Sequence, residues 1–258
     1  KGINTVIIDE VHMAKADVLK RLLTGPFAHC GIRWGLTGTV PKAEYEFMGL
    51  KCSIGDVTHR IQASELQDKG VLANCHVNVL QTQDHPMFKT YAEELKWLTT
   101  DKVRMAWVAK TIKDISTSGN TLILVDRISA GQILQEQLEG SVFVSGSTKN
   151  IDRKEQYDEV STATNKIIIA TYGVASVGIN IPRIFNLVLI EPGKSFVRVI
   201  QSIGRGIRKA EDKENVQIWD ITSSCKFAKR HLGARKKFYK EANYPYNIEK
   251  INYENPYT

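Results

Sequence analysis

Residues 121–125 read Thr-Leu-Ile-Leu-Val, an apolar stretch with Gly-Asn before it and Asp-Arg after it. An apolar run of this length without polar alternation is typical of a strand covered on both faces, as in parallel sheets. Similar runs recur along the chain and alternate with helical patterns. This alternation predicts an α/β fold built on parallel sheets.

The predicted elements divide into two α/β units and a tail. Strands are expected at residues 6–8, 32–36, 76–80, 121–125, 141–144, 166–170, 186–190 and 216–221. Helices are expected at residues 16–23, 63–67, 91–115, 129–138, 153–160 and 197–207. The polar stretch 81–87 contains Pro86 and favours a linker. We therefore predict units over residues 1–80 and 81–225, followed by a tail over 226–258.

The first predicted strand, Val6–Ile8, lies almost at the start of the chain. A buried parallel strand needs neighbours on both sides, and residues 1–4 cannot supply them. We expect the first unit to be truncated at its N-terminus, with the missing N-terminal part of the same protein as a partner.

Composition excludes several classes of protein. The 258 residues contain no apolar run near the ~20 residues that span a bilayer, so no membrane protein is expected. The four cysteines are far apart, which argues against a disulfide scaffold or a cysteine-rich zinc site and favours a reducing compartment, the cytoplasm. The 35 Lys and Arg against 28 Asp and Glu give a net charge of +7, which admits a polyanionic partner.

An acidic segment, Asp9-Glu10-Val11-His12, directly follows the first predicted strand. Ligands bind at the carboxyl ends of strands in open α/β sheets. One carboxylate there can hold hydrated Mg²⁺ while its neighbour activates a water that attacks a phosphate. A solvated acidic turn is an equally good interpretation of these four residues taken alone.

The segment Gln201-Ser202-Ile203-Gly204-Arg205-Gly206-Ile207-Arg208 carries the strongest signal. On a helix, Gln201, Arg205 and Arg208 fall on one face. Guanidinium groups placed in this way suit the charge of a transferring phosphoryl group. A basic solvated face is the alternative. Three further loops, at residues 36–39, 145–148 and 170–182, combine glycines with hydroxyl side chains and are ambiguous on their own.

In this order and spacing, the segments resemble the motifs of superfamily 2 helicases and translocases of the DExH type. DEVH resembles motif II, TGT motif III, residues 122–127 motif IV, SGST motif IVa, ATYGVASVGINIP motif V and QSIGRGIR motif VI. The resemblance implies two RecA-like domains, with ATP bound between them and nucleic acid across them.

The resemblance also implies roles for single residues. Asp9 would bind Mg²⁺, Glu10 would activate water, and His12 would contact motif III or VI on the nucleotide side. The segment Thr37-Gly38-Thr39 would couple nucleotide state to nucleic-acid binding. The remaining assignments are phosphate contacts by Gln201, Arg205 and Arg208, nucleotide contacts by Gly178 and Asn180, and nucleic-acid contacts by Ser145, Gly146 and Thr171.

Two departures from the family pattern matter. Asn180 stands where many relatives have Asp, so a ribose hydrogen bond is possible without the charge. The chain also has no G-x-x-x-x-G-K-[ST] phosphate loop, which ATP hydrolysis requires. We expect ATP and Mg²⁺ to be the cofactors of the longer protein and this chain alone to be inactive.

The tail contains a basic segment, residues 226–240, with no acidic residue. Phe227, His231, Ala234 and Phe238 recur at helical spacing and predict an apolar stripe beside a basic face. We expect Lys229, Lys236 and Lys237 to contact DNA phosphates, although a solvated face would have the same pattern.

The leading hypothesis is an ATP-dependent DNA helicase or translocase that acts on forks or junctions in recombination and repair. The expected partner is therefore DNA with branches or single-strand/double-strand junctions. The alternatives are the motor subunit of a restriction system and a DNA-binding module without hydrolysis. The intact DEVH segment and both arginines of QSIGRGIR argue against the binding module, because binding alone needs neither.

Overall fold

The computed structural model describes residues 2–13, 16–37, 40, 44–61, 65, 69, 74–146, 164–176, 183–193, 215–241 and 243–253. The chain divides into two compact units, Lys1–Ile61 and Gln62–Thr258. The predicted boundary at residue 80 is wrong, because β3 (Asn74–Thr82) pairs with strands of the second unit. The prediction of a linker between units in the polar stretch 81–87 is therefore also wrong, because this stretch lies within the second unit.

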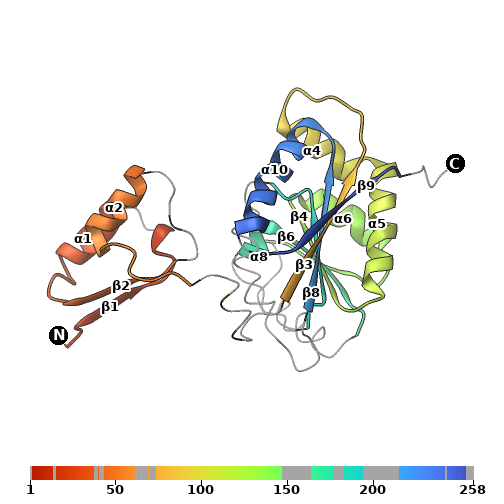
Figure 1. The fold of residues 1–258 in the computed structure, drawn as a ribbon. Helices are drawn as coiled ribbons and strands as arrows, with labels where there is room; N and C mark the ends of the chain where they lie inside the picture. Colours follow the sequence, from red (N-terminus) through yellow and green to blue (C-terminus); the bar gives the residue numbers. More distant parts are fainter. Residues whose placement is uncertain are drawn as a thin grey trace. The chain divides into compact units, whose positions relative to one another are not determined.

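The first unit contains a short parallel sheet covered by helices on one face (Figure 1). Its elements are β1 (Thr5–Ile8), the 3₁₀ helix η1 (Val11–Met13), α1 (Ala16–Thr24), β2 (Ile32–Gly35) and α2 (Glu44–Ile54). Val6 and Ile8 alternate toward a core formed with Leu19, Leu23 and Leu50. The side chains that alternate with them face away, and Ile7 and Trp34, paired in the β1–β2 register, are 64% and 62% exposed.

The second unit is built on a parallel sheet of seven strands in the order β5-β6-β4-β7-β8-β3-β9. The other strands are β4 (Thr121–Val125), β5 (Val142–Val144), β6 (Ile167–Thr171), β7 (Asn186–Ile190), β8 (Asn215–Ser223) and β9 (Tyr246–Ile251). The helices are α4 (Tyr91–Thr100), α5 (Lys102–Ser116), α6 (Ile128–Gln137), α8 (Tyr172–Ser176) and α10 (Lys226–Glu241). The prediction of a parallel α/β fold is confirmed.

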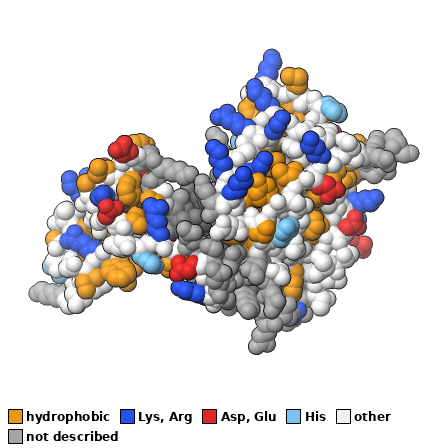
Figure 2. Space-filling model, viewed as in Figure 1, with side chains coloured by type: hydrophobic (Ala, Val, Ile, Leu, Met, Phe, Trp, Pro, Cys, Tyr) orange, Lys and Arg blue, Asp and Glu red, His pale blue; other side chains and the backbone are white. Residues whose placement is uncertain are grey.

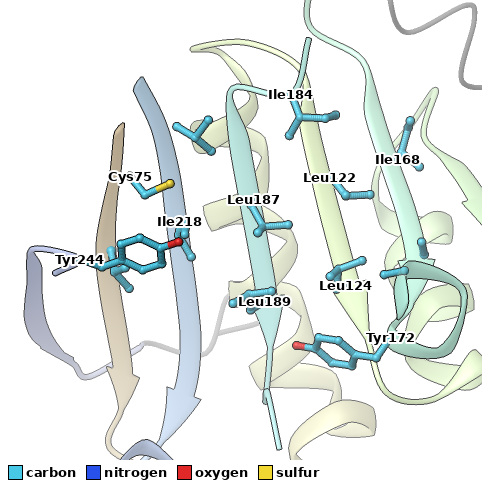
Figure 3. Packing of buried hydrophobic residues seen from close by; sticks show 14 of the residues in the cluster. Cys75, Leu122, Leu124, Ile168, Tyr172, Ile184, Leu187, Leu189, Ile218 and Tyr244 are labelled. Atoms are coloured by element: carbon cyan, nitrogen blue, oxygen red, sulfur yellow. The ribbon is translucent and has the colours of Figure 1, made fainter. Parts of the chain in front are cut away.

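Both faces of this sheet are covered, which explains the unbroken apolar runs. Leu122 and Leu124 of β4 face a cluster that includes residues of α8 and α10 (Figure 3). Ile123 and Val125 face the opposite cluster, which α5 and α6 complete. Every side chain of β4 is therefore buried, on one face of the sheet or the other.

Two elements differ from the sequence prediction. The helix predicted at 91–115 is two helices, because Asp101 ends α4 and its side chain accepts a hydrogen bond from the N–H of Arg104 to begin α5, at 2.9 Å. The tail predicted as a separate segment over 226–258 belongs to the second unit. Its helix α10 packs in the core of the second unit, and β9 extends the sheet beside β3.

The predicted helices at 153–160 and 197–207 lie outside the described residues, as does most of 63–67. Within the described residues, no helix combines the length and the apolar character needed to cross a bilayer. All four cysteines are free.

Candidate functional site

The acidic pair Asp9 and Glu10 lies exposed at the carboxyl end of β1. Glu10 has a φ of 49°, and its N–H donates to Asp9 Oδ1 at 2.9 Å. This tight turn directs the chain out of the strand within two residues. A carboxylate has about four acceptor positions, so this hydrogen bond leaves positions on Asp9 that can bind a cation.

The donor set fits hydrated Mg²⁺ better than a metal held by protein ligands alone. Within the part of the chain that the structure describes, no group of three or more His, Cys, Asp or Glu side chains could hold a metal ion. Mg²⁺ keeps several waters and is commonly bound by one or two carboxylates together with substrate phosphates. Asp9, exposed and next to a second carboxylate, meets this requirement.

His12 connects the acidic pair to the segment that follows β2. Its Nδ1 lies 2.6 Å from Thr37 Oγ1 and 3.4 Å from Glu10 Oε2. The backbone supports this contact, since Leu36 donates to Ile8 at 2.8 Å and accepts from Val11 at 3.0 Å. The structure therefore brings together four predicted site residues that follow two different strands.

Several predicted site residues lie outside the described residues. They are the phosphate-facing Gln201, Arg205 and Arg208, the nucleotide-contacting Gly178 and Asn180, and Gly38 and Thr39 of the coupling segment. Ser145, Gly146 and Thr171 are described and follow or end the neighbouring strands β5 and β6. These three residues therefore share one edge of the sheet. Ser145 is buried, Gly146 is exposed, and Thr171 is half-buried and accepts from the N–H of Val174 at 3.4 Å.

The same edge of the sheet holds a buried ionic network that the sequence reasoning missed. Arg104, fully buried on α5, donates to Glu191 Oε1 at 2.5 Å, and its Nε lies 3.4 Å from Asp84 Oδ2. Asp84 also accepts from Thr82 and Ser223, each at 2.6 Å. The sequence signal was weak, because these acids and this arginine are far apart along the chain.

The pKa values of the two acids are shifted in opposite directions. Burial raises the pKa of Glu191 to about 7, because the opposing charges of Arg104 and Arg235 do not outweigh the loss of solvent. Burial also acts to raise the pKa of Asp84, but Arg104 and hydrogen bonds from hydroxyl groups outweigh it and hold that pKa below its ordinary value. Asp84 is therefore the charged partner of Arg104 throughout the neutral range.

Helix α10 is described over the length predicted for the basic segment, but its buried face differs from the prediction. The buried residues are Ala228, His231, Leu232, Arg235 and Tyr239. Ala234 of the predicted stripe is exposed, and Phe227 and Phe238 are only half-buried. The stripe is rotated because Arg235 points inward, where Asp220 binds it through two hydrogen bonds of 2.8 and 3.0 Å.

The opposite side of α10 is called the basic face here. It comprises Lys226, Lys229, Arg230, Lys236, Lys237 and Lys240, of which Lys236 is half-buried and the others are exposed. Figure 2 shows Lys and Arg side chains gathered over this helix. The helix is fixed at its N-terminus by the buried carboxylate of Glu94 on α4, which accepts from the N–H groups of Phe227 and Ala228 at 3.1 and 2.7 Å.

Comparison with known proteins shows which proteins this chain is similar to. Residues 104–210 match the model of the helicase conserved C-terminal domain. The chain is 26% identical over 241 residues to the ATP-dependent DNA helicase uvsW of Enterobacteria phage T4, covering 89% of this chain and 48% of that protein. The chain resembles the superfamily 2 helicases and is similar to the C-terminal part of UvsW.

Solved structures share the fold of this chain. The crystal structure of T4 UvsW matches with a TM-score of 0.61 and 21% identity, covering 97% of this chain and 54% of UvsW. A fragment of a putative HsdR subunit of a type I restriction enzyme from Vibrio vulnificus matches with a TM-score of 0.71 and 18% identity, covering 97% and 48%. The chain thus spans about half the length of these relatives.

Proposed function

We propose that this chain is part of an ATP-driven DNA helicase or translocase that remodels branched DNA in recombination and repair. The observation that carries the proposal is the contact set of His12, which joins Glu10 of the acidic pair to Thr37 after the neighbouring strand. A solvated acidic turn would not need a half-buried histidine held between two strand ends. DNA-helicase relatives support the same assignment.

In this proposal Asp9 binds Mg²⁺, whose chemistry is to neutralise charge that develops on the phosphates of ATP. Glu10 accepts the proton of the water that attacks the terminal phosphate. A single ring nitrogen of His12, Nδ1, lies next to both the carboxylate of Glu10 and the hydroxyl of Thr37. A change in the Glu10 carboxylate therefore reaches the segment Thr37-Gly38-Thr39, which we propose couples nucleotide state to DNA binding.

The residues that the structure does not describe complete the proposal. Gln201, Arg205 and Arg208 would face the phosphates, and Gly178 and Asn180 the nucleoside. Ser145, Gly146 and Thr171, which share one edge of the sheet, would contact the DNA backbone together with the basic face of α10. The six cations of that face suit a polyanion, because they lie on one side of a fixed helix.

A further part of the same protein would supply the phosphate loop. This part of the proposal is supported by the lengths of the relatives, of which the chain spans about half. It is also supported by the apolar side chains of Ile7 and Trp34, which remain exposed on the sheet face opposite the helices of the first unit. The four free cysteines suit the cytoplasm as the place of action.

The test is ATP hydrolysis by the longer protein that contains this chain and a phosphate loop. Glu10→Gln should lower turnover by about 10²-fold or more, because an amide cannot take up the proton of the attacking water. Binding of ATP and DNA should change little. The matched control is Glu44→Gln, which alters an exposed acid of α2 in the same unit.

Near-normal turnover in the Glu10→Gln variant would refute the role of Glu10. DNA binding by the unaltered protein without any hydrolysis would favour the DNA-binding module instead.

A further inference from the structure

The loop between β3 and α4, residues 83–90, exposes an apolar side chain almost completely. Met87 is 97% exposed, the highest value among the large hydrophobic side chains of the described residues. Burial of a methionine side chain stabilises a fold, so an exposed methionine contributes no such stability. A single exposed apolar residue is common on protein surfaces, and its meaning depends on how it is held.

The loop holds Met87 between two anchored neighbours. On one side, the Cys225 thiol donates to the carbonyl of Pro86 at 3.5 Å, and the Ser224 hydroxyl donates to the carbonyl of Asp84 at 3.0 Å. On the other side, Phe88 packs against Trp97 with ring centroids 5.8 Å apart, in a cluster that includes buried residues of α4 and α10. The exposure of Met87 is therefore imposed by the fold.

Two lysines lie near this position. Lys89 is exposed within the loop, which also contains the exposed His85, and the exposed Lys226 begins the basic face directly after Cys225, the residue that contacts Pro86. The acid nearest in sequence on α4, Glu93, binds the N–H of Thr90 at 3.2 Å in a capping box. Figure 2 shows hydrophobic, histidine and cationic side chains together at this end of the second unit.

An apolar contact flanked by cations fits a nucleic acid better than a protein. Phosphates suit the cations, and apolar side chains such as methionine act as wedges against bases at unstacked steps. A protein-binding site would need a larger apolar patch than one side chain.

We propose that Met87 contacts bases exposed at the junction between duplex and single-stranded DNA, while the basic face of α10 holds the adjacent phosphates. This inference rests on the proposed function, because it assumes that the basic face binds DNA. It adds a residue that contacts the bases at the single-strand/double-strand junction.

The experiment measures binding of this chain to forked DNA, with 2-aminopurine as the base at the junction, and to blunt duplex of equal length. The unaltered chain should bind the fork about fivefold more tightly and change the 2-aminopurine fluorescence. Met87→Ser should lose both effects while duplex affinity stays within about twofold. Met87→Leu should retain both, because leucine keeps the apolar bulk.

The matched control is Met48→Ser, which removes another exposed methionine on α2 of the first unit. A Met87→Ser variant that keeps its fork preference would overturn the inference, as would one that weakens binding to fork and duplex equally. Failure of the unaltered chain to bind any DNA would instead refute DNA binding by the basic face, which belongs to the proposed function.

Discussion

Replacing Arg235 by methionine should destabilise the second unit strongly, because this arginine of the basic segment is buried in an ion pair. The guanidinium is 3% exposed and donates to both oxygens of Asp220 and, at 2.5 Å, to the carbonyl of Pro192. Tyr239 donates to the same carboxylate at 2.7 Å. Removing one partner of a buried ion pair leaves an uncompensated charge and costs about 3–5 kcal/mol.

Urea unfolding, followed by circular dichroism, measures this loss. With an m-value of about 2 kcal/mol/M, a loss of about 4 kcal/mol moves the unfolding midpoint of Arg235→Met by about 2 M. Lys237→Met on the exposed side of the same helix is the control, and its effect should stay within about 0.5 kcal/mol. The double variant Arg235→Met with Asp220→Leu should recover much of the loss, since no charge is then left unpaired. A cost below about 1 kcal/mol for Arg235→Met would refute the buried pairing.

Three further predictions concern pH, salt and catalysis. Because burial raises the pKa of Glu191 from 4.5 to about 7, the stability that its bound proton contributes is present at pH 4.5 and lost as pH rises to 7. The free energy of unfolding of Glu191→Gln, measured with urea, should therefore increase relative to that of the unaltered chain between pH 4.5 and about 7. The free energy of unfolding of Glu249→Gln, an exposed control, should not increase in this way. Changing Lys229, Lys236 and Lys237 to alanine should weaken the salt dependence of duplex binding: the slope of log affinity against log salt concentration should fall in magnitude by about 0.9 for each lost phosphate contact. The control changes the exposed α5 lysines Lys102, Lys110 and Lys113 to alanine and should leave this slope unaltered. The chain alone should release no phosphate from ATP, and DNA-stimulated release by it would contradict the need for a phosphate loop.

The central strands β4, β6 and β7 were predictable because their apolar runs are buried on both faces. The stretch 121–125 shows this directly, since alternate side chains fill the two opposite cores. Assignment of β3 to a unit was not predictable, because its partners β8 and β9 follow more than 130 residues later and local patterns carry no pairing information. The strand β9 was missed because Pro245 and the charged residues Glu249 and Lys250 are typical of a loop as much as of an edge strand.

The placement of the candidate site residues was predictable where they are close together in the sequence. Asp9, Glu10 and His12 lie within four residues, and their contact with Thr37 follows from two adjacent parallel strands that end side by side. The inward position of Arg235 was not predictable, because the helical pattern of residues 226–240 does not show which charge finds a buried partner. Only Asp220, a buried acid on the neighbouring strand β8, makes burial of that charge favourable.

The most direct test of the central claim is ATP-dependent remodelling of forked DNA by the longer protein that contains this chain. The unaltered protein should convert the fork only when ATP and Mg²⁺ are present. The Glu10→Gln variant should bind ATP and the fork but should not convert it. Fork conversion by the variant at a rate near that of the unaltered protein would refute ATP-driven remodelling through Glu10.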